Sequence, residues 1–537
     1  MKAIRISAIF FLLGIAVVTL LGSTAGGRSG YLDGEKPIAS GKWTAAPNTQ
    51  NCSHRANKLW MTVTNWGFLG SQFNSSQLKE FYCLGPDIEQ GSLAPSAEFP
   101  AGSGINYLYE GALWIGAIVD SDTLVSVGAD GWQWVFEMYP QASPNGGIVR
   151  RTNRPTDPNH DPSALNDLDM IAEYYDTLAD EAWTGRDPMD NRSHIPIGLK
   201  IVQESYSWSQ ASYEDFIVFR YHIKNISSHT LNKVFIGLHY DTDVWHPATP
   251  NGFQDDVSGS YFTEDSLRDD QVLIGWSADN DGDPSRTGQW TSQSTLAILG
   301  VSLLDFPTQP KQSFNWWVSN GDATLDWGPR RQENNRNFGT GGLGTPAGDR
   351  NKYYIMSTSE HDYDQLWSAV DHSAKGWLPP AANIASNLAD GYDTQFLFSF
   401  GPIDLAPGES TEFAFVVAMG DNFHRNPTDF QELFDPNNPQ AFCDSLDFSD
   451  LTTNILAARR LYRQLFVIVS GDADRSGEVD IADAVFLIRY IFMGGPAPSP
   501  LDVGDANGDC SIDIADVVYL IEYIFAGGSA PVEGCVP

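Results

Sequence analysis

The sequence predicts a mainly β protein, built from β-sandwich-like domains, that ends in a small all-α module of two loop–helix repeats. Three observations support this class. The chain holds 49 Gly and 31 Pro with only 19% charged residues, which suits a turn-rich β protein. Short apolar runs bounded by turn residues recur over residues 26–430. An Asp-rich loop followed by a helical run then occurs twice near the end.

Composition limits the function classes. The chain has 537 residues, a size typical of roughly three to four domains, and 42% hydrophobic residues are ample for large cores. There are 68 acidic and 32 basic side chains, a formal net charge of −36. Binding to nucleic acid or to anionic lipid by charge needs a basic face, so this balance argues against both.

Residues 1–25 have the pattern of a signal peptide. Lys2 and Arg5 precede the apolar run 6–21, and Ser23-Thr24-Ala25 offers small residues at a cleavage site. The alternative is a membrane anchor, for which the apolar run is short. We therefore expect a secreted protein, extracellular or associated with the cell surface, with no membrane span in the mature chain.

Five cysteines lie in the exported part, where disulfides persist. Sequence alone does not fix their pairing. We favour Cys510–Cys535, as a staple of the C-terminal module, and Cys52–Cys83. Cys443 is then left as a buried, inert thiol.

The two C-terminal repeats carry the clearest chemistry. Residues 472–483 run into a helical stretch, and residues 505–516 repeat the pattern 33 positions later. Oxygen ligands at loop positions 1, 3, 5, 7, 9 and 12 can surround one hard cation of calcium's size. The candidate metal ligands are Asp472, Asp474, Ser476, Glu478 (carbonyl), Asp480 and Asp483 in the first loop, and Asp505, Asn507, Asp509, Ser511 (carbonyl), Asp513 and Asp516 in the second.

Metal binding and folding should be coupled in these loops, because clustered carboxylates repel one another without a cation. The alternative is a pair of solvated acidic turns, but two copies in register argue against it. Position 8 of each loop is apolar and would join the loops through the core (Val479 and Ile512). Apolar residues also recur at helical spacing in the two following stretches (Val485, Ile488 and Phe492; Val518, Ile521 and Phe525).

Two such loops, each followed by one helix and lacking the first helix of a full EF-hand, resemble a type I dockerin over residues 471–537. The resemblance implies Ca²⁺ as cofactor and a cohesin-like protein domain as partner, through which the carrier joins an extracellular or surface assembly. This sequence departs from the family pattern at position 6 of the second loop, where Cys510 replaces Gly. Positions 10 and 11, Ile481-Ala482 and Ile514-Ala515, imply a more apolar recognition face than that of cellulosomal dockerins.

The middle of the chain is predicted to be strands. We expect a strand pair or one long bent strand over 108–119, and hairpins formed by 216–225 with 234–240 and by 395–400 with 411–418. A helix is expected over 451–466. The expected divisions are an N-terminal β-rich region (26–200), a β-sandwich-like domain (201–430), a helical linker (431–470) and the C-terminal module (471–537). This body is similar to β-rich secreted bacterial proteins that carry such modules.

Acidic residues gather on loops after Asp241. Asp241 and Asp243 close one strand, Asp255 and Asp256 follow a Gly-containing loop, and an Asp-rich run spans 279–283. Alternating carboxylates at a sheet edge can hold calcium. Asp also caps its own backbone in ordinary turns. The sequence leaves both interpretations open.

A catalytic role for the body has no motif to support it. The densest aromatic clusters, 132–134 and 315–317, fit sugar stacking or core packing. Glycoside hydrolysis needs two facing carboxylates, and Glu110, Glu204 and Glu214 are three candidates among many. The leading hypothesis is therefore calcium-dependent attachment of a β-rich body to a partner. The alternatives are a carbohydrate-active enzyme, an O-glycosyl hydrolase of polysaccharide catabolism, and a carbohydrate-binding protein.

Overall fold

A computed structural model describes residues 46–72, 78–85, 88–131, 135–266, 270–318, 326–332 and 346–536. The expected signal peptide and the aromatic cluster at 132–134 lie outside these residues. Among the helices of the described part, none has the length and apolar character needed to cross a membrane.

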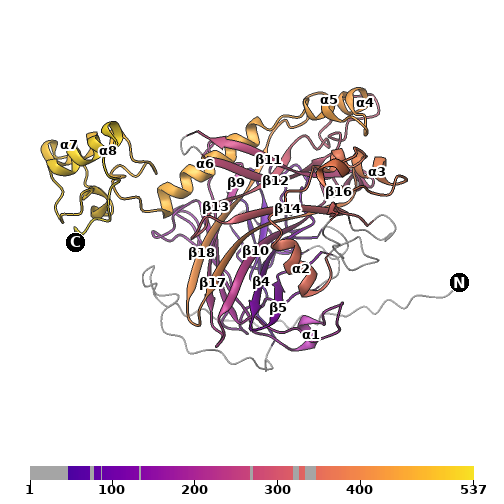
Figure 1. Cartoon of the computed structure of the whole chain (residues 1–537), viewed down its shortest axis with the longest axis horizontal. Helices are drawn as coiled ribbons and strands as arrows, with labels where there is room; N and C mark the ends of the chain where they lie inside the picture. The colour runs from indigo at the N-terminus through magenta and orange to yellow at the C-terminus, as the bar shows by residue number, and fades with distance from the viewer. Residues whose placement is uncertain are drawn as a thin grey trace. The chain divides into compact units, whose positions relative to one another are not determined.

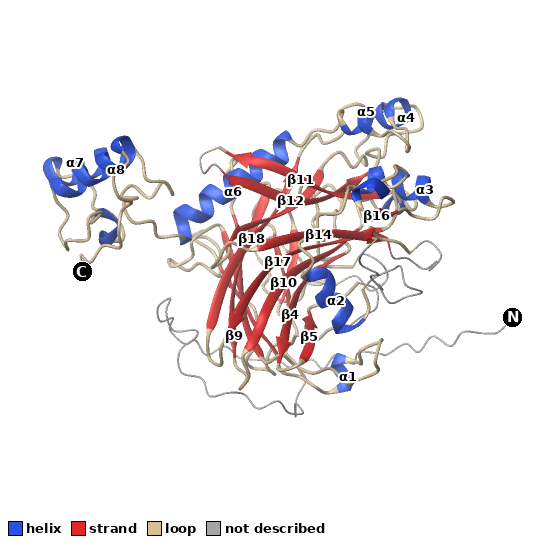
Figure 2. Cartoon of the chain, viewed as in Figure 1, coloured by secondary structure: helices blue, strands red, loops and turns tan. Residues whose placement is uncertain are grey.

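Two eight-stranded antiparallel sheets form the body (Figures 1 and 2). The first sheet has the order β1 (Asn51–His54), β2 (Met61–Thr64), β3 (Phe68–Gly70), β4 (Glu110–Val119), β10 (Leu231–Thr242), β17 (Thr394–Leu405) and β14 (Lys311–Val318), with β5 (Asp122–Val127) also paired to β4. The second has the order β11 (Asp256–Asp265), β12 (Asp270–Asp279), β13 (Ile298–Asp305), β18 (Ser410–Gly420), β9 (Phe216–Asn225), β8 (Leu199–Ser207), β7 (Leu168–Asp176) and β6 (Val149–Arg151).

The main core lies between these sheets, because alternate residues of both point inward. Aromatic rings stack across neighbouring strands of the second sheet, with centroids 5.0 Å apart for both Phe219–Phe415 and Tyr221–Phe413. Each large apolar side chain buried there contributes roughly 1.5–3 kcal/mol. The expected sandwich-like, mainly β class is confirmed.

Helices cover the outer faces of the sheets. Helix α2 (Gly348–Met356) packs on the first sheet through Ile355 and Met356. Helix α6 (Ser449–Phe466), which confirms the helix expected over 451–466, packs on the second through Leu451 and Ile455. The shorter elements are α1 (Glu181–Thr184), α3 (Ala385–Asp390), α4 (Asp429–Leu433), α5 (Gln440–Cys443) and the two-stranded sheet of β15 (Arg330–Arg331) and β16 (Trp377–Leu378).

Both predicted hairpins are wrong. β9 and β10 follow one another in sequence, but β9 pairs with β8 and β18 while β10 pairs with β4 and β17. β17 and β18 are likewise in different sheets. The chain therefore crosses from one sheet to the other at both connections, and each of the four strands pairs with at least one strand from a distant part of the sequence. The segment expected at 108–119 is one long strand, β4, which turns directly into β5.

The two crossovers are joined by Asn225. Its backbone N–H donates to the Glu409 carbonyl at 2.9 Å, and its own carbonyl accepts from Gly408 N–H at 2.9 Å. Its side-chain amide donates to the Leu405 carbonyl at 3.0 Å. One buried amide thus satisfies backbone groups of both connections, which would otherwise be left without partners.

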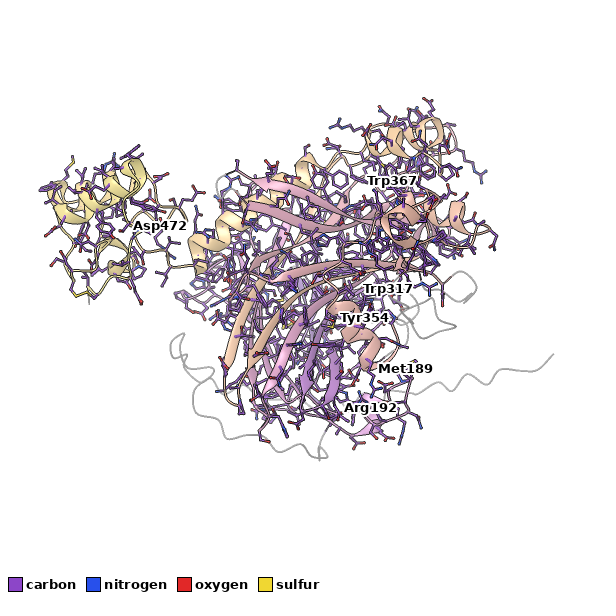
Figure 3. All side chains as sticks on the ribbon, viewed as in Figure 1. Met189, Arg192, Trp317, Tyr354, Trp367 and Asp472 are labelled. Carbon is purple, nitrogen blue, oxygen red and sulfur yellow. A yellow bond between two sulfur atoms is a disulfide. The ribbon has the colours of Figure 1, made fainter. Side chains whose placement is uncertain are left out.

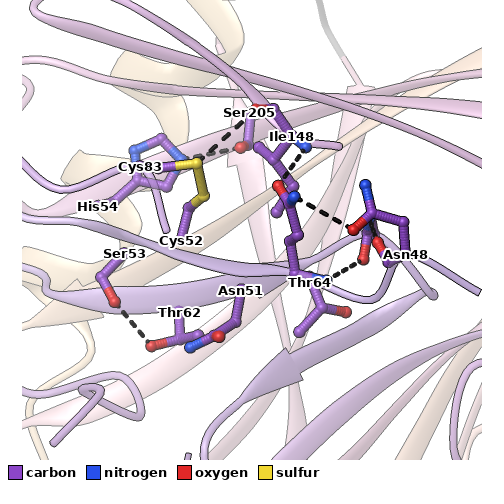
Figure 4. The surroundings of a disulfide bond; sticks show 12 residues. Asn48, Asn51, Cys52, Ser53, His54, Thr62, Thr64, Cys83, Ile148 and Ser205 are labelled. Atoms are coloured by element: carbon purple, nitrogen blue, oxygen red, sulfur yellow. Dashed lines mark hydrogen bonds between the residues drawn. A yellow bond between two sulfur atoms is a disulfide. The ribbon is translucent and has the colours of Figure 1, made fainter. Parts of the chain in front are cut away.

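The expected division at residues 200 and 201 falls inside β8, and strands from both sides of it share the two sheets. Cys52 and Cys83 form the expected disulfide and tie β1 to the segment between β3 and β4 (Figure 4). Beside it, His54 bonds the hydroxyls of Ser205 and Ser207, both at 2.8 Å. Cys443 is free and half-buried, and burial raises the pKa of its thiol to about 12, which makes it a poor nucleophile.

Candidate functional site

Each C-terminal repeat folds as a loop followed by a capped helix, α7 (Ile481–Met493) and α8 (Ile514–Ala526). Asp480 and Asp513 are the N-cap residues, and their carboxylates accept from the N–H groups of Ala482 and Ala515 at 2.6 and 2.7 Å. The carboxylates of the third helical residues bond back to the N-cap N–H groups, which completes a capping box in both repeats. Each helix ends at a glycine in the left-handed conformation.

The first loop gathers three carboxylates. One oxygen from each of Asp472, Asp474 and Asp483 lies within 4.8 Å of the others, and Asp472 is labelled in Figure 3. The backbone fixes these groups: Asp472 accepts from the N–H groups of Ser476 and Gly477, both at 2.9 Å, and Asp483 accepts from Asp474 N–H at 3.0 Å. Ligands about 2.4 Å from one ion are at most about 4.8 Å apart, so this spacing suits a single calcium ion.

Repulsion between the buried carboxylates of the first loop favours the binding of a positive charge. Burial, with Asp474 nearby, raises the pKa of Asp472 above its usual value. Burial and the carboxylates of Asp474 and Asp472 raise the pKa of Asp483 to about 7. A divalent cation would remove this repulsion by neutralising the cluster.

The second loop repeats these backbone contacts with the same number of carboxylates among its predicted ligands. Asp505 accepts from the N–H groups of Asp509 and Cys510, both at 3.0 Å, and Asp516 accepts from Asn507 N–H at 3.2 Å. The amide of Asn507 stands where the first loop has the Asp474 carboxylate. Asp509 in turn stands where the first loop has Ser476, so each loop offers four carboxylates among its predicted ligands.

The remaining predicted ligands have these positions. Asp480 and Asp513 are exposed and cap their helices, so they lie at the edge of the loops. The Glu478 carbonyl accepts from the Ser476 hydroxyl at 3.2 Å, and Ser511 N–H donates to Asp509 at 3.0 Å.

Cys510 takes the left-handed conformation of the glycine it replaces, with φ of +66° against +91° for Gly477. It forms the expected disulfide with Cys535. Asp505 lies close to both sulfurs, but sulfurs joined in a disulfide are not thiolates and do not serve as metal ligands. The Cys535 N–H donates to Asp505 at 2.9 Å, so the C-terminal tail braces the second loop.

The core of the module is small, and most apolar residues at helical spacing lie outside it. The core holds Ala473, Ala484, Leu487, Ala506, Val517 and Leu520, with Val479 and Ile512 packed against it as expected. Four further apolar residues at helical spacing form an exposed stripe on each helix: Ile481, Val485, Ile488 and Phe492 on α7, and Ile514, Val518, Ile521 and Phe525 on α8. Phe492 is 64% exposed and Phe525 69% exposed. We call these the two apolar stripes.

The body contains a second acidic cluster, part of which the sequence indicated. Asp241 and Asp243 are joined by Asp393, and one oxygen from each lies within 4.8 Å of the others. Nothing in the local sequence around Asp393 pointed to it. Burial and the Asp393 carboxylate raise the pKa of Asp241 and Asp243 well above their usual range. Burial, and then Asp283, raises the pKa of Asp255 to about 7 in the neighbouring Asp-rich loops.

The candidates for sugar binding and hydrolysis in the body are engaged in its packing. Trp316 and Trp317 are wholly buried, so they offer no flat face to a sugar ring. Glu110 accepts from Gln72 and from Gly131 N–H, both at 2.7 Å. The other two candidates, Glu204 and Glu214, form ion pairs with Arg220 and Lys58.

Residues 470–525 match the family model of the dockerin type I domain, and this match covers both loops, α7 and all but the last residue of α8. Comparison with curated protein sequences finds no match to the chain. The family match and the loop geometry agree, so the C-terminal module is a type I dockerin.

Proposed function

We propose that this type I dockerin binds Ca²⁺ in both loops and thereby attaches a secreted β-rich body to a cohesin-like domain of an extracellular or cell-surface assembly. The observation that carries the proposal is the pair of apolar stripes, exposed on two helices whose N-termini are set by the acidic loops. A small module gains nothing from exposing eight large apolar residues unless a partner covers them.

Each loop is linked to its apolar stripe through residues that belong to both the loop and the helix. Asp483 and Asp516 belong both to the loops, where they face the other carboxylates, and to the first turns of α7 and α8. A cation bound by these carboxylates therefore fixes the first helical turn, which carries Ile481 or Ile514. Calcium binding thus orders the residues that would meet the partner.

The chemistry of the stripes defines the partner. The first helical residues are Ile481 and Ile514, followed by Ala482 and Ala515, and both isoleucines are exposed. Such a face fits an apolar surface on the partner better than one that reads hydroxyl groups.

Binding of the full-length chain to a panel of immobilised cohesin domains tests the proposal. We expect binding in 1 mM Ca²⁺, a standard saturating level for sensor-type loops, and its loss in excess chelator. The double variant Ile481→Ser/Ile514→Ser should weaken binding at least about 100-fold, the scale of two interface anchors. Ile468→Ser, at an exposed position before the loops, is the matched control. Binding unaffected by chelator and by the double variant would refute the proposal.

Secretion is tested separately. Expression of the full chain in a host with a general secretion pathway should release a protein whose first residue is Gly26. Retention of the protein in the membrane fraction with residues 1–25 still attached would contradict it.

A further inference from the structure

The second acidic cluster results from the register between β10 and β17. In the pairing of β10 with β17, Asp241 lies opposite Gln395 and Thr242 opposite Thr394, so the next pair in register is Asp243 with Asp393. Asp241 and Asp243, two residues apart, project to the same side. Three carboxylates from two adjacent strands thus converge at one end of the first sheet, with oxygens within 4.8 Å of one another.

The second sheet adds a buried acceptor that has no donor. Asp256 begins β11 and is 0% exposed. Its Oδ2 accepts from Val244 N–H at 2.8 Å, and its carbonyl accepts from Tyr392 N–H at 2.8 Å. These two bonds hold Asp256 beside the residue after Asp243 and the residue before Asp393. Its other oxygen, Oδ1, is buried without a hydrogen-bond partner.

The pattern continues along the second sheet. Asp279 is the register partner of Asp256, is 0% exposed, and has a buried Oδ2 without a partner. A buried carboxylate oxygen without a donor costs about 1–3 kcal/mol or more. Two register partners that each carry such an oxygen point to a missing positive group at this place.

In the described residues, no basic side chain forms an ion pair with Asp241, Asp243 or Asp393. Another acidic cluster of the body provides the comparison. Asp215, Asp421 and Asp450 also gather their oxygens within 4.8 Å, but Lys58 lies 3.4 Å from Asp215 and 3.0 Å from Glu214. That cluster has its own cation, whereas the cluster at Asp241 has none among the described residues.

We propose that Asp241, Asp243 and Asp393 bind a divalent cation, with Ca²⁺ as the ion that fits, and that the orphan oxygen of Asp256 completes the cage directly or through a water. Calcium accepts 6–8 oxygen ligands in irregular geometry, which suits carboxylates supplied by strand ends. The bound ion would cross-link the ends of β10 and β17 to the start of β11, and so fasten one sheet to the other. This site is separate from the dockerin and does not depend on its function.

The test uses the full-length chain with the dockerin loops silenced by Asn substitution at Asp472, Asp483, Asp505 and Asp516. Equilibrium dialysis with radioactive Ca²⁺ then counts the ions held by the body. Adding Asp243→Asn and Asp393→Asn should lower the count by one ion per chain. Adding Asp421→Asn, in the cluster that holds Lys58, should leave the count unchanged. Equal counts with and without the Asp243 and Asp393 substitutions would overturn the proposal.

A second measurement covers the case in which the doubly substituted cluster does not fold. In the silenced chain alone, Ca²⁺ should raise the melting temperature of the body by several degrees relative to chelator, since it binds only the folded state. An unchanged melting temperature would overturn the proposal. Because the dockerin loops are silenced throughout, neither result bears on whether the dockerin binds a partner.

Discussion

Cys510 donates its backbone N–H to Asp505 at 3.0 Å while its sulfur is bonded to Cys535, whose own N–H donates to the same carboxylate oxygen at 2.9 Å. The disulfide and the first predicted ligand of the second loop are therefore parts of one arrangement. A left-handed conformation costs a residue other than Gly roughly 1–2 kcal/mol. A disulfide that spans 25 residues contributes about 3 kcal/mol. The stabilisation from the disulfide is therefore larger than the cost of the left-handed backbone at Cys510.

Removing the disulfide should weaken the second loop. We expect Cys510→Ser/Cys535→Ser to destabilise the module by about 2–4 kcal/mol and to lower the calcium affinity of that loop. Calcium titration followed by hydrogen exchange of residues 505–526 measures both effects. The comparison variant Cys510→Gly/Cys535→Ser relieves the backbone strain without restoring the cross-link. If it were as stable as the native chain, strain alone would explain the role of Cys510.

Removing a carboxylate from the first loop should prevent low concentrations of calcium from stabilising α7. The substitution Asp472→Asn retains the shape of the side chain but removes its charge, so we expect a loss of calcium affinity of about 100-fold or more at this loop. At sub-saturating Ca²⁺, hydrogen exchange over residues 481–493 should become fast while residues 514–526 stay protected. Exchange that is insensitive to Asp472→Asn would contradict the coupling of metal to helix.

Packing of α6 on the second sheet depends on a glycine. A Cβ at Gly300 would lie 2.7 Å from Leu451 Cδ1, so Gly300→Ala should cost about 1–3 kcal/mol. Leu451→Ala alone should cost about 2–5 kcal/mol by opening a cavity. Since the smaller side chain removes the clash, the double variant should be more stable than the sum of the single changes by at least about 1 kcal/mol. Urea unfolding of all four proteins measures this coupling, and strict additivity would show that the two residues do not meet.

The pH dependence of stability should show the contribution of His222. Burial opposes its charge, but ion pairs with Glu204 and Glu412, at 3.2 and 2.8 Å, raise its pKa to about 9. A pKa raised above the unfolded value of about 6.5 means that the stabilisation is complete below pH 6.5 and disappears as the pH rises through 9. The contribution is at most about 3 kcal/mol, and less in practice because Glu412 is half exposed.

Urea unfolding at pH 6 and pH 9.5 checks this prediction. The stability difference between the native chain and His222→Gln should be large at pH 6 and small at pH 9.5. His229→Gln, at an exposed pair with Asp120, is the control and should change stability little at either pH. A difference for His222→Gln that does not vary with pH would show that the imidazole is not charged in the fold.

The sequence by itself determined the dockerin. Its predicted ligands, caps and helices all lie within two short segments, so spacing along the chain is enough to predict them, and the close repeat makes each copy support the prediction for the other. The mainly β class followed in the same way from turn residues and short apolar runs. Even the pairing of Cys510 with Cys535 could be favoured, because the two cysteines lie within one small module.

Tertiary structure alone decided the paths of the strands. Alternation along 216–225 shows which residues are buried, but a five-residue connection serves a hairpin and a crossover equally well. One of the two partners of β9 is β18, about 190 residues away, and only the packing of the whole body selects it. Asp393 joins Asp243 for the same reason, since register between distant strands leaves no trace in the residues around either one. The tertiary structure also decided that the apolar stripes of α7 and α8 are exposed. Helical spacing marks an apolar face but does not tell whether that face packs against the core or contacts a partner.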